Sequence, residues 1–454
     1  MLQLFDTAKG GVAPVELREP GKVSMYVCGP TVYGPPHLGH GRFSLVFDVL
    51  RRYLEWSGLD VTYVSNITDI DDRIIQRAQD EDRDWHDIAR RCEAVWYRAM
   101  DALGVRRPDQ DPHATAYVEQ MVALIERLVA RGAAYETSDG VYFVAERVDD
   151  YGLLARQPLD SLKAGARVEG TGEKRSPVDF ALWKKAKPGE PHWPSPWGEG
   201  RPGWHTECVV MALDLLGDDF DLHGGGQDLA FPHHENERAQ AVADGRRFAR
   251  AWVHNGFVEV EGTKMSKSLG NVTNLVDLVE QYDGRAYRLL VLRSHYRSPI
   301  DVTDDTLRDA EAGLGRLDAF ARRVASVEGL AGVAPDAGAL DRFRDAMDDD
   351  LQTPAATGLL FDLVRRANAA LDAGEVTTAG PLAAAAAEIA AALGLEMRAG
   401  GAEAPDEVRA WAAERDAARA AKDWARADAL RDRITGAGYL VEDTAAGTVV
   451  RPAG

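Results

Sequence analysis

Two widely separated segments of this chain carry side chains of the types that can bind phosphate groups. His37 and His40 flank a glycine just before a predicted helix, where imidazoles and backbone N–H groups can face an anion. Lys264 and Lys267 lie among hydroxyl side chains in a segment that ends at a glycine. Either segment alone is also explained by surface histidines or by a solvated turn. Together, in this order and about 225 residues apart, they predict a site for a nucleoside triphosphate.

A second set of side chains has the chemistry of a metal site. The chain has three cysteines: Cys28, Cys92 and Cys208. So sparse and odd a set argues against a disulfide framework and leaves metal binding open, although a buried cysteine is often only packing. His233 and Glu237 are four residues apart, so on a helix both leave one face. On spacing alone His234 or Glu235 fits as well.

The elements expected around these residues form a parallel α/β unit. A buried strand at 23–27 ends at Cys28, a helical stretch runs from about 43 to 57, and a second strand follows at 61–64. Further strands are expected at 220–222 and 252–254. Ligands of such units bind beyond the carboxyl ends of the strands. The predicted fold class is therefore α/β with a parallel sheet.

The motifs resemble the HIGH and KMSKS sequences of class I aminoacyl-tRNA synthetases, and other segments narrow the resemblance to the cysteinyl-tRNA synthetase family. Those segments are Met25–Tyr33, Asn66–Asp72, Gly203–Cys208, His223–Gly226 and Phe231–Glu237. The resemblance extends from near the N-terminus to the tail. It implies ATP-dependent activation of cysteine to cysteinyl-adenylate, followed by transfer to the terminal ribose of tRNA(Cys). Cysteine, ATP and tRNA(Cys) are thus the expected partners.

The resemblance also implies roles for the phosphate-binding side chains. His37, His40, Lys264 and Lys267 would be catalytic, and all but Lys264 would bind ATP, with Mg²⁺ as its companion ion. Attack of the cysteine carboxylate on the α-phosphorus is catalysed mainly by positioning and by stabilising charge on phosphoryl oxygens. The histidines therefore suit the α-phosphate, and Lys267 suits the leaving pyrophosphate.

Matched residue by residue, the family's metal ligands fall on Cys28, Cys208, His233 and Glu237, which implies one Zn²⁺ ion per chain. A steric pocket separates cysteine poorly from the nearly isosteric serine. A soft thiolate binds zinc better than a hydroxyl does, so coordination would select the thiol. The residues expected in the substrate pocket are Cys28, Gly29, Thr68, Trp204, His205, His223 and Asp228.

The resemblance and the composition together suggest five parts. These are a Rossmann-like catalytic domain in two halves (1–119 and 201–303), a connective insertion (120–200), a helical bundle (304–397) and a small α+β anticodon-binding module (398–454). The insertion contains a hairpin predicted from Tyr135 to Val144. The last part is expected to hold one charged helix, about 406–434, and a short hairpin around Gly447.

Bulk properties set the cellular expectations. The chain has 454 residues, 45% of them hydrophobic and 28% charged, as in an ordinary folded, water-soluble protein. Its formal net charge of −20 does not suggest a nucleic-acid binder, but a local basic face can still bind phosphates. Residues 1–6 lack the features of a signal peptide, and no apolar run reaches membrane-spanning length. We expect a cytoplasmic monomer with no membrane partner.

Two other functions share these motifs. One is a ligase that joins activated cysteine to an amino sugar in mycothiol synthesis, which resembles a shortened synthetase. The charged helix and hairpin of the tail favour the synthetase. The other is a non-catalytic tRNA- or metal-binding paralogue, against which the intact His37, His40 and Lys267 argue.

Overall fold

A parallel four-stranded sheet forms the centre of the computed structural model. The structure describes residues 1–165, 173–260, 263–264, 274–399, 405–444 and 447–452. The sheet order is β10-β9-β3-β4, and each neighbouring pair is parallel. Its strands are β3 (Lys22–Val27), β4 (Asp60–Val64), β9 (Phe220–Gly226) and β10 (Ala249–Asn255). The predicted α/β class and all four predicted strand positions are confirmed, although β9 and β10 extend beyond the predicted segments.

Helix α1 (Leu38–Trp56) connects β3 to β4, and it begins five residues before the predicted start at Phe43. The reason lies in its first turn, where the ring Nδ1 of His40 accepts a hydrogen bond from the backbone N–H of His37 at 3.1 Å. That bond satisfies one of the backbone donors that a helix start leaves unpaired. Further along, Leu45, Leu50 and Tyr53 are buried in the main hydrophobic core. The early start places both histidines at the helix N-terminus.

Further elements complete this domain around the sheet. An N-terminal antiparallel hairpin precedes it, formed by β1 (Gln3–Asp6) and β2 (Gly11–Pro14). The helices are α2 (Asp72–Asp80), α3 (Trp85–Ala102), α6 (Trp204–Leu215), α7 (Glu235–Ala243), α8 (Leu275–Gln281) and α9 (Gly284–Leu292). A second small sheet contains β11 (Val258–Val260), β12 (Thr263–Lys264) and β13 (Ile300–Asp301).

The insertion between the two halves has its own antiparallel sheet. Its strands are β5 (Ala134–Glu136), β6 (Gly140–Phe143), β7 (Phe180–Lys185) and β8 (Gly200–Pro202), accompanied by α4 (Val118–Ala130) and α5 (Leu159–Gly165). The hairpin predicted from Tyr135 to Val144 is confirmed, since β5 and β6 pair antiparallel. Buried Phe143 and Trp183 belong to a core that also includes Cys28 and Cys208. The insertion is therefore packed against the side of the catalytic domain that carries Cys28 and Cys208.

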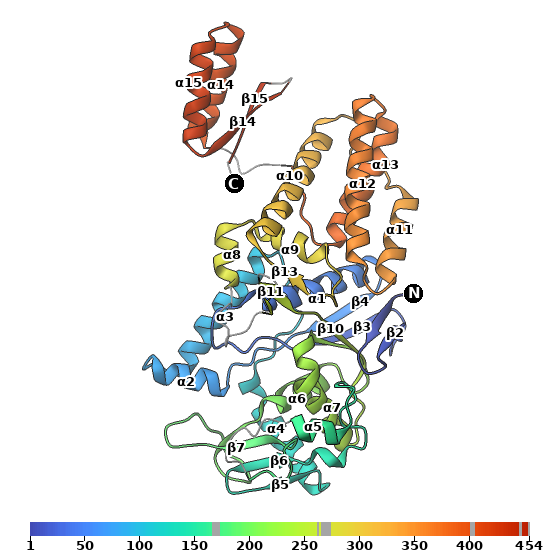
Figure 1. Ribbon diagram of the computed structural model, residues 1–454, viewed down its shortest axis with the longest axis vertical. Helices are drawn as coiled ribbons and strands as arrows, with labels where there is room; N and C mark the ends of the chain where they lie inside the picture. The colour runs from blue at the N-terminus through green and yellow to red at the C-terminus, as the bar shows by residue number, and fades with distance from the viewer. Residues whose placement is uncertain (166–172, 261–262, 265–273, 400–404, 445–446, 453–454) are drawn as a thin grey trace.

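Four helices follow the catalytic domain. They are α10 (Asp304–Ser326), α11 (Ala337–Asp348), α12 (Thr353–Asp372) and α13 (Val376–Ala392). Their alanine and leucine faces, including Leu317, Leu360 and Ile389, share one continuous core with the central sheet. In Figure 1 these helices and the insertion lie at opposite ends of the catalytic domain. Among the described residues, no helix combines the length and the apolar character that crossing a membrane requires.

The tail forms a separate small unit, and here one prediction is wrong. The segment predicted as a single helix over 406–434 is two helices, α14 (Asp406–Ala420) and α15 (Trp424–Gly436), with Lys422 at a φ of 62° between them. The hairpin predicted around Gly447 is confirmed as β14 (Tyr439–Thr444) and β15 (Gly447–Pro452).

Folding the helix back explains that break. The turn buries Val408 and Ala412 of α14 against Ile434 of α15, which a straight helix could not do. Asp423 caps the new helix by accepting the backbone N–H of Arg426. Figure 1 shows the unit projecting away from the four-helix bundle.

Candidate active site

A cavity of about 350 Å³ opens at the carboxyl ends of the parallel strands. Nine residues predicted from sequence line it: Cys28, Gly29, His37, His40, Thr68, Trp204, Cys208, Asp228 and His233. His37, His40 and three of the four predicted metal ligands thus line one cavity, whereas Glu237, the fourth, is not among the described residues that line it. Two predicted pocket residues, His205 and His223, are not among the described residues that line it. Lys267 lies outside the described residues, and Lys264 ends β12, where only the backbone is described.

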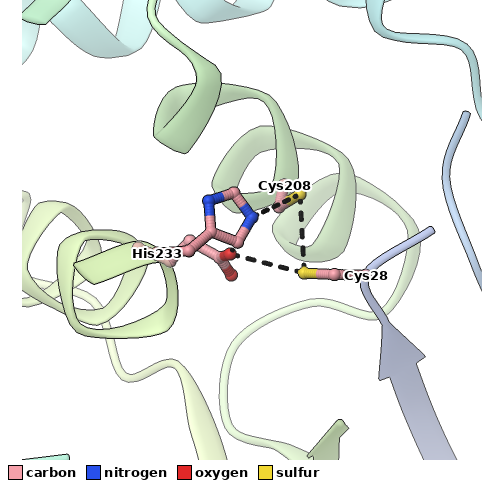
Figure 2. Close-up of side chains that lie close together, drawn as sticks. Cys28, Cys208 and His233 are labelled. Carbon is pink, nitrogen blue, oxygen red and sulfur yellow. Dashed lines mark hydrogen bonds and ion pairs between the residues drawn. The ribbon is translucent and has the colours of Figure 1, made fainter. Parts of the chain in front are cut away.

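The four predicted metal ligands converge from four different segments. Cys28 follows β3, Cys208 lies within α6, His233 lies in the irregular helical turn Ala230–His234, and Glu237 lies in α7. His233 and Glu237 are thus not both within one regular helix, yet His233 Nε2 lies 2.9 Å from Glu237 Oε1. Cys28 Sγ is 3.7 Å from Cys208 Sγ and 3.4 Å from Glu237 Oε1. Cys208 Sγ is 3.6 Å from His233 Nε2, and Figure 2 shows the three labelled side chains pointing toward one another.

These distances fit a zinc ion. In a tetrahedral site with bonds of about 2.3 Å to sulfur and about 2.1 Å to nitrogen or oxygen, ligand atoms lie roughly 3.4–3.8 Å apart. The three distances that involve sulfur match this range. The His233–Glu237 pair is closer, at the hydrogen-bond distance of 2.9 Å. Two thiols, one imidazole and one carboxylate, all buried, also form a donor set that zinc accepts.

A second group of possible ligands shares Cys28 and Glu237 but replaces Cys208 and His233 by His223 and His234. His223 already contacts Glu237 Oε2 through its Nε2 at 2.6 Å. Neither His223 nor His234 is among the described residues that line the cavity, whereas Cys208 and His233 both are. Of the two groups, the first is the one with more side chains on the cavity wall, where a bound metal could meet a substrate.

His205 and His223 lie behind the metal-binding residues. The Nδ1 atoms of His205 and His233 are 2.8 Å apart, and the Nε2 of His223 contacts Glu237. Such outer contacts hold ligand side chains in one orientation. Both histidines were predicted as pocket residues, and the structure places them one layer further back.

The charges in this group are strongly coupled. Burial opposes ionisation of Glu237, but the neighbouring His223 and His233 hold its pKa well below the usual value. Burial likewise disfavours a charged His233, yet the Glu237 carboxylate raises the pKa of His233 to about 10. The hydrogen bond from Cys28 lowers the pKa of Cys208 to about 6, whereas burial raises the pKa of Cys28. A cation that binds here must therefore displace protons.

Gly29 and Thr68 are tied together through Asn66, which the predicted pocket did not include. The side-chain oxygen of Asn66 accepts the backbone N–H of Gly29 at 2.9 Å, and its amide donates to Thr68 at 3.1 Å. A Cβ atom at Gly29 would lie 1.7 Å from the carbonyl oxygen of Asn66, so only glycine fits. The hydroxyl of Thr68 donates to Glu207 at 2.8 Å, and burial raises the pKa of Glu207 well above its usual value.

His37 and His40, the histidines predicted to bind phosphate, occupy another part of the cavity wall. The rings of His37 and His40 are stacked, with centroids 3.7 Å apart, and Trp96 meets His40 edge-on. Several residues that line the cavity were not singled out from sequence: Thr31, Tyr33, Asn66, Arg73, Asn255, Gly256, Phe257 and Val258. Arg73 lies over the ring of Tyr33 at 4.6 Å. Its position directly after the Asn66–Asp72 segment is the signal that could have identified it.

Comparison with known proteins defines the class first. A family model described as the class I (C) tRNA synthetase catalytic domain matches residues 14–312, and a DALR domain model matches residues 342–398. Methionyl-tRNA synthetase of Mycobacterium tuberculosis, solved with methionyl-adenylate, has a similar fold. Its TM-score is 0.64 at 17% identity, over 83% of this chain and 92% of that one. The fold and these matches make the chain a class I aminoacyl-tRNA synthetase.

Full-length relatives then identify the particular family. The chain is 45% identical to the cysteine–tRNA ligase of Geobacter sulfurreducens, over 98% of both chains. It is 46% identical to that of Halorhodospira halophila over 99% of both, and 44% identical to that of Chromobacterium violaceum over the full length of both. The chain belongs to the cysteine–tRNA ligase family.

Proposed function

We propose that this member of the family activates cysteine with ATP and transfers it to tRNA(Cys), and that Cys28, Cys208, His233 and Glu237 hold a zinc ion that recognises the substrate thiol. The observation that carries this proposal is the shared cavity. Three of the four donors, Cys28, Cys208 and His233, line the same space as His37 and His40, so a thiol held at one side can have its carboxylate near the phosphates of ATP.

Zinc, when bound, supplies a Lewis-acidic centre that favours a thiolate over a hydroxyl and can accept a further ligand. The protein's own side chains do the remaining work. His205 and His223 orient His233 and Glu237 from behind. The Gly29–Asn66–Thr68 group fixes the wall beside Cys28, where the substrate's backbone groups would lie.

Activation joins a carboxylate oxygen of cysteine to the α-phosphorus of ATP and breaks the bond to the β-phosphate, so that pyrophosphate leaves. In our proposal His37 and His40 bind the α-phosphate, and Lys264 and Lys267 stabilise the negative charge that grows on the leaving group, together with Mg²⁺. The terminal ribose hydroxyl of tRNA then attacks the adenylate carbonyl carbon, and AMP leaves. The nucleotide chemistry therefore stays apart from the metal-binding residues.

The amino-sugar ligase is not favoured, because the matches to cysteine–tRNA ligases cover nearly the whole chain, tail included. We propose the five parts given above as the domain boundaries, with 398–454 as the anticodon-binding module. Two further expectations are a cytoplasmic location and a monomeric state.

The test is ATP–pyrophosphate exchange with cysteine or serine, followed by aminoacylation of a tRNA pool. Cysteine should support exchange, and serine should be at least about a thousandfold poorer, because roughly 4 kcal/mol of discrimination corresponds to that ratio. Exchange with serine near the cysteine rate would contradict recognition by zinc. Transfer of activated cysteine to the amino sugar, with no charging of tRNA, would contradict the ligase assignment.

A further inference from the structure

Arg42 is a buried cation that is held by backbone carbonyl groups. It lies on α1 two residues after His40, and its side chain is almost wholly buried. Among the ion pairs formed by the described residues, none includes Arg42. Its guanidinium instead donates to the carbonyl oxygens of Phe257 at 2.5 Å and Tyr296 at 3.1 Å, and also to that of Ser298. Burial lowers the pKa of Arg42 to about 10.

The accepting carbonyls belong to two segments that are joined to each other. Gly256 donates its N–H to the Tyr296 carbonyl at 2.8 Å, and Ile300 donates to the Phe257 carbonyl at 3.0 Å. A Cβ atom at Gly256 would lie 2.4 Å from the carbonyl oxygen of Arg297, so the contact is close. The first of these segments, 256–258, lines the cavity and leads through β11 to Lys264 in β12.

Arg42 therefore links two parts of the cavity wall. One is the start of α1, which carries His37 and His40, and the other is the 256–258 segment. Burying a charge without an opposite charge is costly, and here several carbonyl dipoles must offset that cost. A planar guanidinium can donate to several carbonyls at once in fixed directions, which a lysine ammonium cannot reproduce. An apolar side chain could fill the same space, but it could not form the hydrogen bonds that fix the start of α1 relative to the 256–258 segment.

We infer that Arg42 is a positioning residue for ATP, because it fixes the 256–258 wall relative to His37 and His40. This inference rests on the proposed function. The hydrogen-bond partners that the structure describes for the Arg42 side chain are backbone carbonyls of the 257 and 295–298 segments, none of which belongs to the proposed metal ligands, so its loss should affect the nucleotide rather than cysteine. A misplacement of about 1 Å from a residue distant from the chemistry can slow a reaction that depends on positioning by about a hundredfold.

The test compares Arg42→Lys and Arg42→Gln with Arg51→Lys in the full-length, zinc-loaded protein. Arg51 is the control because it lies on the same helix, is also buried, and donates to a backbone carbonyl, that of Arg107. Unlike Arg42 it also pairs with Glu55 and Asp109, so the comparison asks whether loss of any buried arginine of α1 has the same effect. Arg51 lies nine residues further on, about 13 Å along the helix axis. Arg42→Lys keeps the charge and some of the hydrogen bonds, so it is expected to fold. Arg42→Gln removes the charge as well and keeps fewer N–H donors, so its effect should be larger.

In cysteine-dependent exchange, Arg42→Lys should lower kcat/KM for ATP at least tenfold, and Arg42→Gln should lower it further. KM for cysteine and zinc content should stay within twofold of the unsubstituted protein, and Arg51→Lys should leave all of these values within twofold. Equal effects of Arg42→Lys and Arg51→Lys would overturn the inference, as would a matching rise in KM for both substrates. If the unsubstituted protein itself shows no exchange, the proposed function fails instead.

Discussion

Four side chains from distant parts of the chain form the donor set, and each is held by a different local structure. Cys28 is placed by the end of a buried strand, where its N–H bonds the carbonyl of Gly224 at 3.2 Å. Cys208 lies on a buried helix face, and Glu237 is fully buried in α7. Several of these donors must lose protons before a cation can bind, and that cost is offset only when all four coordinate it. Removal of one donor should therefore lower the affinity of the remaining three for zinc.

Cys208→Ser should remove most of the zinc and reduce cysteine-dependent exchange at least a hundredfold, because an alcohol is a poor zinc ligand. ATP binding should change far less, since His37 and His40 are untouched. Cys92→Ser is the matched control, because Cys92 is equally buried but lies in a separate small core. Metal analysis of both purified variants makes the check. Full zinc occupancy in Cys208→Ser would rule out its role as a ligand.

His205→Ala should weaken zinc binding by a factor of about 10–100, because the outer contact that orients His233 is lost while all four donors remain. The measurement is competition for zinc against a chelator of known affinity. His192→Ala, at an exposed histidine of the insertion, is the control and should bind zinc like the unsubstituted protein. A His205→Ala protein that matches this control would show that the contact is incidental.

At the scale of elements, a buried ion pair joins α1 to α9, and a hydrogen bond from the same arginine reaches the end of α13. Asp48 on α1 contacts Arg288 on α9 at 2.7 Å and Arg52 at 2.8 Å, and both Asp48 and Arg288 are buried. Arg288 also donates to the carbonyl of Leu393, just beyond α13. Helix α1, which carries His37 and His40, is thus linked to the four-helix bundle through Asp48 and Arg288. Because both charges are buried away from water, each depends on the other for compensation.

Asp48→Asn should destabilise the protein by about 3–5 kcal/mol at neutral pH, because Arg288 would be left buried without its counter-charge. Thermal unfolding measures this loss, with Asp305→Asn as a control at a fully exposed ion pair on α10. If Asp48→Asn lost no more stability than Asp305→Asn, the carbonyl groups around Arg288 would be enough to compensate its buried charge without Asp48. The pH dependence provides a second measurement.

Burial opposes ionisation of Asp48, but Arg288 and Arg52 prevail and lower its pKa. A carboxyl with a lowered folded pKa stabilises the protein above its unfolded pKa, near 4, and loses that contribution as pH falls through the folded pKa. The stability difference between the unsubstituted protein and Asp48→Asn should therefore be constant above about pH 5 and should shrink below about pH 4. A difference that grows on acidification would contradict this assignment.

At the scale of the whole molecule, the tail has its own small core, separate from the one that joins the catalytic sheet to the bundle. Val408, Ala412 and Ile434 form that core with partly buried side chains of the hairpin. The main core ends at Leu395 along the chain. The cavity residues all lie between Cys28 and Val258, so the described site does not depend on the tail.

A protein truncated after residue 399 should therefore still form cysteinyl-adenylate but charge tRNA poorly, mainly through a raised KM for tRNA. Exchange and aminoacylation measured on the same preparation separate the two steps, and circular dichroism checks that the shortened chain is folded. Charging with an unchanged KM for tRNA would show that the tail is not the tRNA-binding module that we propose.

The sequence by itself determined the elements and the chemical character of the site. Strands at 23–27 and 61–64 follow from short apolar runs bounded by turn residues, which are local signals. The His37–His40 motif was visible from residue type and position before a helix, whereas the Phe231–Glu237 segment was recognised through its resemblance to the cysteinyl-tRNA synthetase family. These features depend on neighbouring residues along the chain, so they can be predicted without knowing which distant segments meet.

Only the tertiary structure decided which side chains face the cavity. Spacing could not separate His233 from His234; the family resemblance selected His233, and the structure gives the reason, since the irregular turn before α7 sets which ring lines the cavity. It could not show that His205 and His223 lie one layer behind. The break at Lys422 and the carbonyl contacts of Arg42 were equally hidden. Each depends on contacts between segments far apart in sequence, and the burial gained in those contacts outweighs the local preferences that a sequence pattern records.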